Sequence, residues 1–248
     1  ANMDVMMLAA FGCSAEAIGF FGVGSQIVVN LREIRLVFSS SYTPVVARYH
    51  AAGDQVALSD SFAMVTRWVM PYVLPAALVI VVLRDDLLRV FHGAFHGDSS
   101  FMLWLLAAPL LNCAFGLAGN IVVASGHSGY ALLNSVFIFG ANFALNWLLI
   151  PSYGILGAAI ASGVASLLFS AAELTEARYL AGARLGLRLV HKPFLALVVP
   201  LAILWPVQLL GWDATLGGRV ALALAAVALF ASGLFLLGID PRDRPVLL

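Results

Sequence analysis

Several separate apolar stretches, each about 20 residues or longer, constrain the fold of this 248-residue chain more than any other feature. A helix of about 20 residues crosses the ~30 Å hydrocarbon core of a bilayer, since each residue adds about 1.5 Å. The chain is 62% hydrophobic and 10% charged, with a mean hydropathy of +0.99, whereas soluble domains are about half apolar and a quarter charged. The sequence therefore predicts an all-α fold, a polytopic bundle of transmembrane helices.

Turn residues divide the chain into about eight helices, of which the first is truncated. We expect them over residues 3–11, 15–49, 62–83, 101–124, 130–150, 154–174 with a charged extension towards 180, 193–210 and 218–239. The first apolar run is too short to span a bilayer, and no signal peptide with a basic segment precedes it. We therefore expect the chain to be part of a longer protein.

The stretch "NWLLIPSYGILGAAIAS", residues 146–162, separates two of these helices. Pro151 cannot continue the hydrogen-bond ladder of the helix before it, and Gly154 can adopt backbone angles closed to other residues. The pattern predicts a tight turn between two antiparallel spans. Gly157, Ala161 and Ala165 follow at four-residue spacing, and small side chains let helices approach closely in lipid. We expect the second span to be closely packed and central.

The loop charges predict the orientation. Lysine and arginine accumulate on the cytoplasmic side of membrane proteins. The side that holds the C-terminus carries the larger set, Arg48, Arg178, Arg184, Arg188, Lys192, Arg242 and Arg244, and the opposite side carries Arg84, Arg89 and Arg219. We therefore expect a cytoplasmic C-terminus, with the turn at residues 151–154 on the outer face.

Ionisable groups at membrane depth are the candidate binding residues, because they are costly in lipid and usually face a cavity or a partner. Counting from Ile18, Arg32 lies about 21 Å along its helix and Arg35 about 25 Å. Spaced three apart, they share a face, and two guanidinium groups lining a cavity would suit a phosphate or diphosphate. The alternative is that both reach the inner interface with Glu33 as their partner. We include in the candidate site Asp4, which could neutralise one arginine, and the polar residues Gln26 and Asn30.

Other polar residues have structural interpretations. Asn142 and Asn146 are four apart, so they brace two helices or line a polar path. Glu173 and Glu176 fit a solvated helix face, and Cys113 fits a buried thiol. His92 and His96 have the spacing of a metal pair on a helix, but Gly93 and Gly97 weaken a helix there. We predict neither a metal nor a cofactor.

The sequence also bears on broad function classes. A formal net charge of zero does not suggest a nucleic-acid partner. We find no nucleotide-binding loop, no nucleophile elbow and no His-x4-Asp spacing of acyltransferases. The sequence thus favours a protein that is not an enzyme.

Four segments, in order, resemble those of one transporter family. "NWLLIPSYGILGAAIAS" is similar to the "N-x-L-L-I-P-x-x-G-x-x-G-A-A-I-A" stretch of bacterial polysaccharide exporters of the Wzx type. "MDVMMLAAFGCSAEAIGFFGVGSQI" resembles the family's aspartate-bearing helix and the segment after it. "TPVVARYHAAGD" resembles its proline-containing helix end, and "VVASGHSGYALLNSV" its glycine-containing turn. The resemblance covers about residues 3–180. These exporters share a superfamily with the multidrug (MATE) exporters and the peptidoglycan lipid flippase.

The resemblance implies a C-terminal part of a lipid-linked oligosaccharide (O-antigen) flippase. Residues 1–180 would form the second six-helix, MATE-like lobe, and residues 181–248 a basic cytoplasmic loop, two extra helices and a short tail. The implied partners are a polyprenyl-diphosphate-linked oligosaccharide, membrane lipid and a missing N-terminal lobe, in a bacterial inner membrane. The implied activity is export for lipopolysaccharide or other surface polysaccharide synthesis, by alternating access between the lobes. A cation-coupled multidrug exporter and a membrane glycosyltransferase or ligase are the alternatives.

Overall fold

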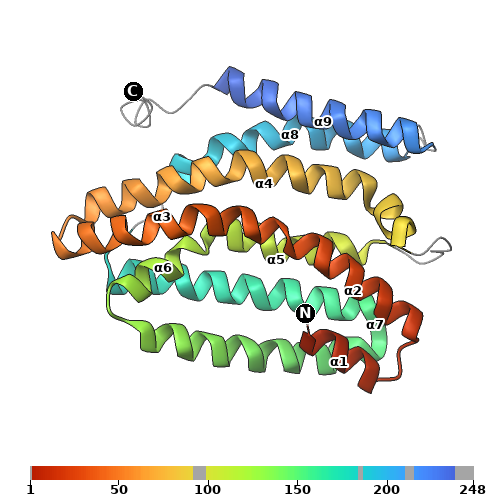
Figure 1. Ribbon diagram of the computed structural model, residues 1–248, viewed down its shortest axis with the longest axis horizontal. Coiled ribbons are helices and arrows are strands. Elements are labelled where there is room, and N and C mark those ends of the chain that lie inside the picture. The colour runs from red at the N-terminus through yellow and green to blue at the C-terminus, as the bar shows by residue number, and fades with distance from the viewer. Residues whose placement is uncertain (1, 92–98, 184–186, 210–214, 238–248) are drawn as a thin grey trace.

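The described part of the chain is almost entirely helical, with no strand, in a computed structural model that describes residues 2–91, 99–183, 187–209 and 215–237. This confirms the all-α bundle expected from the apolar stretches. The helices are α1 (Asn2–Ala10), α2 (Ala15–Val29), α3 (Leu31–Ala51), α4 (Gln55–Phe91), α5 (Phe101–Phe115), α6 (Leu117–Ala124), α7 (Ser128–Leu180), α8 (Leu187–Leu209) and α9 (Leu216–Leu237). They lie roughly side by side, with α8 and α9 at one edge of the bundle and α1 and α7 at the other (Figure 1).

The single helix predicted over residues 15–49 is divided at Asn30. Asn30 keeps right-handed helical angles, φ −59° and ψ −23°, and its N–H donates to the carbonyl of Gln26 at 3.4 Å. Because the backbone stays helical there, α3 continues the general direction of α2 (Figure 1). The helix then extends to Ala51, slightly beyond the expected end.

The third predicted helix, residues 62–83, is longer than expected, because α4 runs from Gln55 to Phe91. At its start the side chain of Asp54 accepts a hydrogen bond from the N–H of Ala57 at 2.9 Å, which caps the first turn. The predicted polar segment after Leu83 begins as helix, and Arg84 donates to the carbonyl of Val81 at 2.8 Å. The polar composition beyond Leu83 thus did not mark the end of the helix.

The span predicted over residues 101–124 is bent by 46° between α5 and α6. Proline is the residue usually expected to bend a helix, yet Pro109 lies inside α5 and the break falls at Gly116. The guanidinium of Arg35 donates to the carbonyl of Gly116 at 3.2 Å. A side chain from α3 thus contacts the backbone of the bend directly.

The turn predicted at residues 151–154 is confirmed. Within α7 the helical backbone breaks at Gly154, whose φ of 55° and ψ of −129° are accessible to glycine alone. The chain reverses there into two limbs, residues 128–153 and 155–180, that run back along one another (Figure 1). In the second limb Gly157, Ala161 and Ala165 are buried, as the small-residue pattern predicted.

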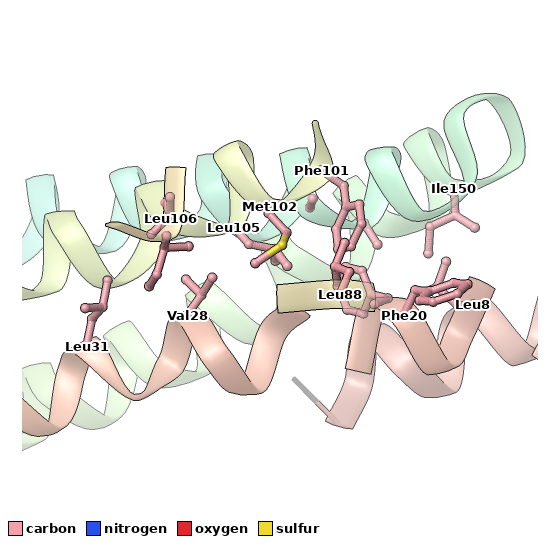
Figure 2. Packing of buried hydrophobic residues seen from close by; sticks show 14 of the residues in the cluster. Leu8, Phe20, Val28, Leu31, Leu88, Phe101, Met102, Leu105, Leu106 and Ile150 are labelled. Atoms are coloured by element: carbon pink, nitrogen blue, oxygen red, sulfur yellow. The ribbon is translucent and has the colours of Figure 1, made fainter. Parts of the chain in front are cut away.

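Three apolar clusters connect the described helices, and the third joins α3, α4 and α6 to the end of α7. The first joins α1, α2 and the start of α3 to α4, α5 and the α7 hairpin, and Val28 and Leu31 lie opposite Leu106 within it (Figure 2). Phe101 packs so closely on Gly24 that a Cβ on the glycine would lie 2.8 Å from its ring. The second cluster joins α4 and α5 to α8 and α9. An ion pair, Arg219 Nε to Asp86 Oδ2 at 2.8 Å, also ties α9 to α4.

In the described residues, three helices are long and apolar enough to cross a membrane: Gln55–Val90, Ser128–Leu180 and Leu216–Leu237. The bent pair of α5 and α6 would add a fourth if it forms one span. The 53 residues of α7 would measure about 80 Å as one straight helix. Since α7 folds back at Gly154, each limb has the length of a separate span. These helices indicate a multi-pass membrane protein.

Candidate functional site

A cavity of about 480 Å³ lies between the α7 hairpin and the helices α1, α2, α3 and α5. The α7 hairpin lines it from both limbs, while α5 contributes apolar side chains and α3 contributes Arg32. Its polar side chains come from five different stretches of helix and are Asp4, Ser25, Arg32, Ser135, Asn142, Ser162 and Ser166. Two of the predicted site residues, Asp4 and Arg32, thus meet at one cavity although they are distant in sequence.

Asp4 is a buried carboxyl group on α1 that holds the two limbs of α7 together. Its Oδ1 accepts hydrogen bonds from Nδ2 of Asn142 at 3.0 Å and from Nδ2 of Asn146 at 2.7 Å. Its Oδ2 accepts from the hydroxyl of Ser162 at 3.0 Å. Asn146 also donates to Oδ1 of Asn142 at 3.3 Å. The two asparagines therefore brace the helices, as predicted, but they do so through an aspartate on a third helix.

Arg32 lies just after the break at Asn30, and its side chain is exposed on the cavity wall. It makes no hydrogen bond or ion pair to any other residue that the structure describes. Asp4 and Arg32 line the same cavity without a described hydrogen bond or ion pair between them, and both carboxyl oxygens of Asp4 accept hydrogen bonds from amide and hydroxyl donors. The guanidinium is consequently available to an anionic ligand in the cavity.

Arg35 does not line this cavity. It is buried and points towards the α5–α6 bend, where its Nη1 donates to the carbonyl of Gly116. Residues three apart on a helix are about 60° apart around its axis. Here that angle places the two arginines against different neighbouring elements. Gln26 and Asn30 are exposed, and neither is among the residues that line the cavity.

The interpretation of Glu173 and Glu176 as a solvated face is wrong. Glu173 is buried, and its carboxyl group lies against Gly119 of α6. Glu176 is half-buried, and its Oε2 accepts a hydrogen bond from Nδ2 of Asn134 at 2.7 Å. Both residues face other helices because the second limb of α7 is surrounded by α5, α6 and the first limb. Their position near a helix end gave no signal of this burial.

His92 and His96, which have the spacing of a metal pair on a helix, lie outside the described residues. Among the described residues, no three His, Cys, Asp or Glu side chains are grouped so that they could hold a metal ion. The buried thiol of Cys113 donates to the carbonyl of Leu31 at 3.5 Å, in agreement with its structural interpretation.

Comparison with known proteins gives a partial match. Over 179 residues the chain is 24% identical to the probable low-salt glycan biosynthesis flippase Agl15 of Haloferax volcanii. This chain is similar to a flippase. The match covers 72% of the chain and 37% of the relative, so the chain spans little more than a third of that protein's length. No family model matches the chain. No solved structure matches it either.

Proposed function

We propose that this chain is part of a membrane transporter that flips a polyprenyl-diphosphate-linked oligosaccharide across the bilayer. The similarity to a probable glycan biosynthesis flippase supports glycan-lipid flipping in general and favours a transporter over an enzyme. The observation that carries the specific proposal is the unpaired, exposed guanidinium of Arg32 on the wall of a cavity of about 480 Å³. Arginine binds phosphate groups through two parallel hydrogen bonds, which suits a diphosphate.

The rest of the cavity fits the other parts of such a substrate. Hydroxyl and amide groups of Ser135, Asn142 and Ser166 can exchange hydrogen bonds with sugar hydroxyls. Ligand cavities are typically about 300–1,000 Å³, so this one holds a diphosphate with its first sugars rather than the whole lipid-linked chain. The polyprenyl tail would stay in lipid, against the exposed apolar side chains of α7 such as Phe137 and Leu148.

Two parts of the chain would have separate roles in such a transporter. Residues 1–180 would be a MATE-like second lobe of the Wzx type, and an N-terminal lobe would form the opposite wall of the cavity. The two lobes would alternate between inward-open and outward-open states. Residues 181–248 would contribute two additional helices and a cytoplasmic tail, in the bacterial inner membrane.

The test is transport of a lipid-linked oligosaccharide by the intact protein in proteoliposomes, with Arg32→Gln as the variant. One charge-assisted contact contributes about 1.5–3 kcal/mol, so transport should fall roughly tenfold or more. Transport by Arg32→Lys should fall less than transport by Arg32→Gln, because lysine keeps the positive charge although it loses the bidentate geometry. Arg48→Gln is the matched control, since Arg48 is exposed on the same helix and does not line the cavity. Transport by Arg32→Gln at the wild-type rate would refute the proposal.

A further inference from the structure

A second polar centre lies in the interior of the bundle, at the α5–α6 bend and apart from the cavity. Two glycines of this segment make room for charged groups from other helices. A Cβ on Gly116 would lie 3.3 Å from Nη1 of Arg35, and a Cβ on Gly119 would overlap the carboxyl group of Glu173. The bend therefore receives a guanidinium from α3 and a carboxyl from α7, one turn apart.

Glu173 is incompletely satisfied as a carboxylate. Its side chain is only 9% exposed, and its buried Oε2 has no hydrogen-bond partner in the described structure. The guanidinium of Arg35 reaches the same bend, but its described hydrogen bond goes to the carbonyl of Gly116. A buried charge without a direct partner is costly, and taking up a proton removes that cost.

The other charged groups around Glu173 are few. From its own helix Glu176 adds a like charge, and α6 carries no ionisable side chain. From α5 only the buried thiol of Cys113 is ionisable. Arg35 from α3 brings a positive charge to the same bend, and a nearby positive charge favours the ionised form of a carboxyl group. Removing its charge should strengthen proton binding.

We propose that Glu173 is a reversible proton-binding site whose ionisation is coupled to the α5–α6 bend through Arg35. Uptake of a proton from water forms an O–H bond on the carboxyl group and cancels its negative charge. The attraction to Arg35, which is attached to the bend at Gly116, is then lost. The ionised form holds α3, α6 and the second limb of α7 together, and the protonated form releases them. This goes beyond the proposed function and does not depend on which substrate the cavity binds.

The test measures the proton directly, by infrared difference spectroscopy of the intact protein in lipid nanodiscs over a pH titration. A carbonyl stretch from a protonated carboxyl should disappear as the pH rises in the wild type. The band should be absent from Glu173→Gln and kept in the matched control Glu176→Gln, one turn further along α7. Arg35→Gln should shift the midpoint of the band to higher pH, and Arg35→Lys should shift it less.

Hydrogen exchange of the α6 backbone amides tests whether ionisation of Glu173 is coupled to the α5–α6 bend. Exchange, corrected for its intrinsic pH dependence, should be faster in the protonated than in the ionised wild type, and this difference should vanish in Glu173→Gln. The same titrating band in Glu173→Gln as in the wild type would overturn the proposal. If Glu173→Gln does not fold, an unchanged midpoint in Arg35→Gln overturns it equally. Since none of these measurements uses transport, loss of transport in Arg32→Gln would neither support nor weaken this inference.

Discussion

Replacing Asn146 with alanine should weaken the attachment of α1 to the α7 hairpin. Asn146 is fully buried, and its amide makes the shortest of the hydrogen bonds to Asp4, at 2.7 Å. The same amide donates to Oδ1 of Asn142 at 3.3 Å. Alanine removes both bonds, while Asn142 still donates to Oδ1 of Asp4.

Two classes of hydrogen bond set limits on the expected loss in the free energy of unfolding. Hydrogen bonds between membrane helices contribute about 0.6 kcal/mol on average, and bonds to charged groups in proteins contribute about 1.5–3 kcal/mol. Against this, Oδ1 of Asn146 is buried without a partner, so the substitution also removes one unsatisfied acceptor. We expect a net loss of about 1–2 kcal/mol in the free energy of unfolding. The bond to Asp4 is short and buried, and removing the unsatisfied carbonyl of Asn146 offsets part of the loss.

A double-mutant cycle isolates the interaction between Asn146 and Asp4. The free energy of unfolding would be measured in mixed micelles for the wild type, Asp4→Ala, Asn146→Ala and the double variant. The coupling energy should be about 1–2 kcal/mol and should exceed that of Ser162 with Asp4, whose hydrogen bond is longer and half exposed. A coupling energy indistinguishable from zero would show that the Asp4 cluster does not hold the hairpin to α1.

Two further predictions concern the chain reversal in α7 and the ion pair between α4 and α9. Gly154→Ala should destabilise the protein by about 1–3 kcal/mol, because the backbone angles at the reversal are accessible to glycine alone. Gly140→Ala is the control in the same helix, since nothing lies within 4 Å of its added Cβ, and its melting temperature should be unchanged or higher. Asp86→Arg and Arg219→Asp should each increase hydrogen exchange of α9, whereas the charge-swapped double variant should recover protection. A double variant no better protected than the single variants would show that the ion pair does not retain α9.

The sequence predicted those features that depend on local chemistry. Pro151 and Gly154 predicted the reversal in α7, because a missing N–H and a freely rotating backbone act on the turn that contains them. Small side chains at four-residue spacing predicted the close packing of the second limb, where Ala158 and Ala161 are fully buried. Both rules refer to neighbours within a helical turn or on one helix face, so they could be applied without knowing the fold.

The polar clusters could not be derived in the same way. The donors to Asp4 lie 138, 142 and 158 residues along the chain, and no spacing rule relates positions that far apart. Glu173 was assigned, together with Glu176, to a solvated face because both lie near the end of their helix. Its burial comes from α6, where Gly119 leaves room for the carboxyl group. The break at Asn30 has no proline or glycine to mark it, which is why one helix was expected there.

The two arginines of α3 show how partners, rather than depth, separate a structural charge from a functional one. Both were assigned to the same site because they lie at similar depth on one helix face. Arg35 is buried and is engaged by the carbonyl of Gly116, so removing it would disturb the bend whatever the cavity binds. Arg32 is exposed on the cavity wall and has no described partner. Its guanidinium can therefore form charge-assisted hydrogen bonds to an anion in the cavity. For this reason Arg32 rather than Arg35 is the residue whose loss should weaken recognition of a diphosphate roughly tenfold or more while leaving the fold intact.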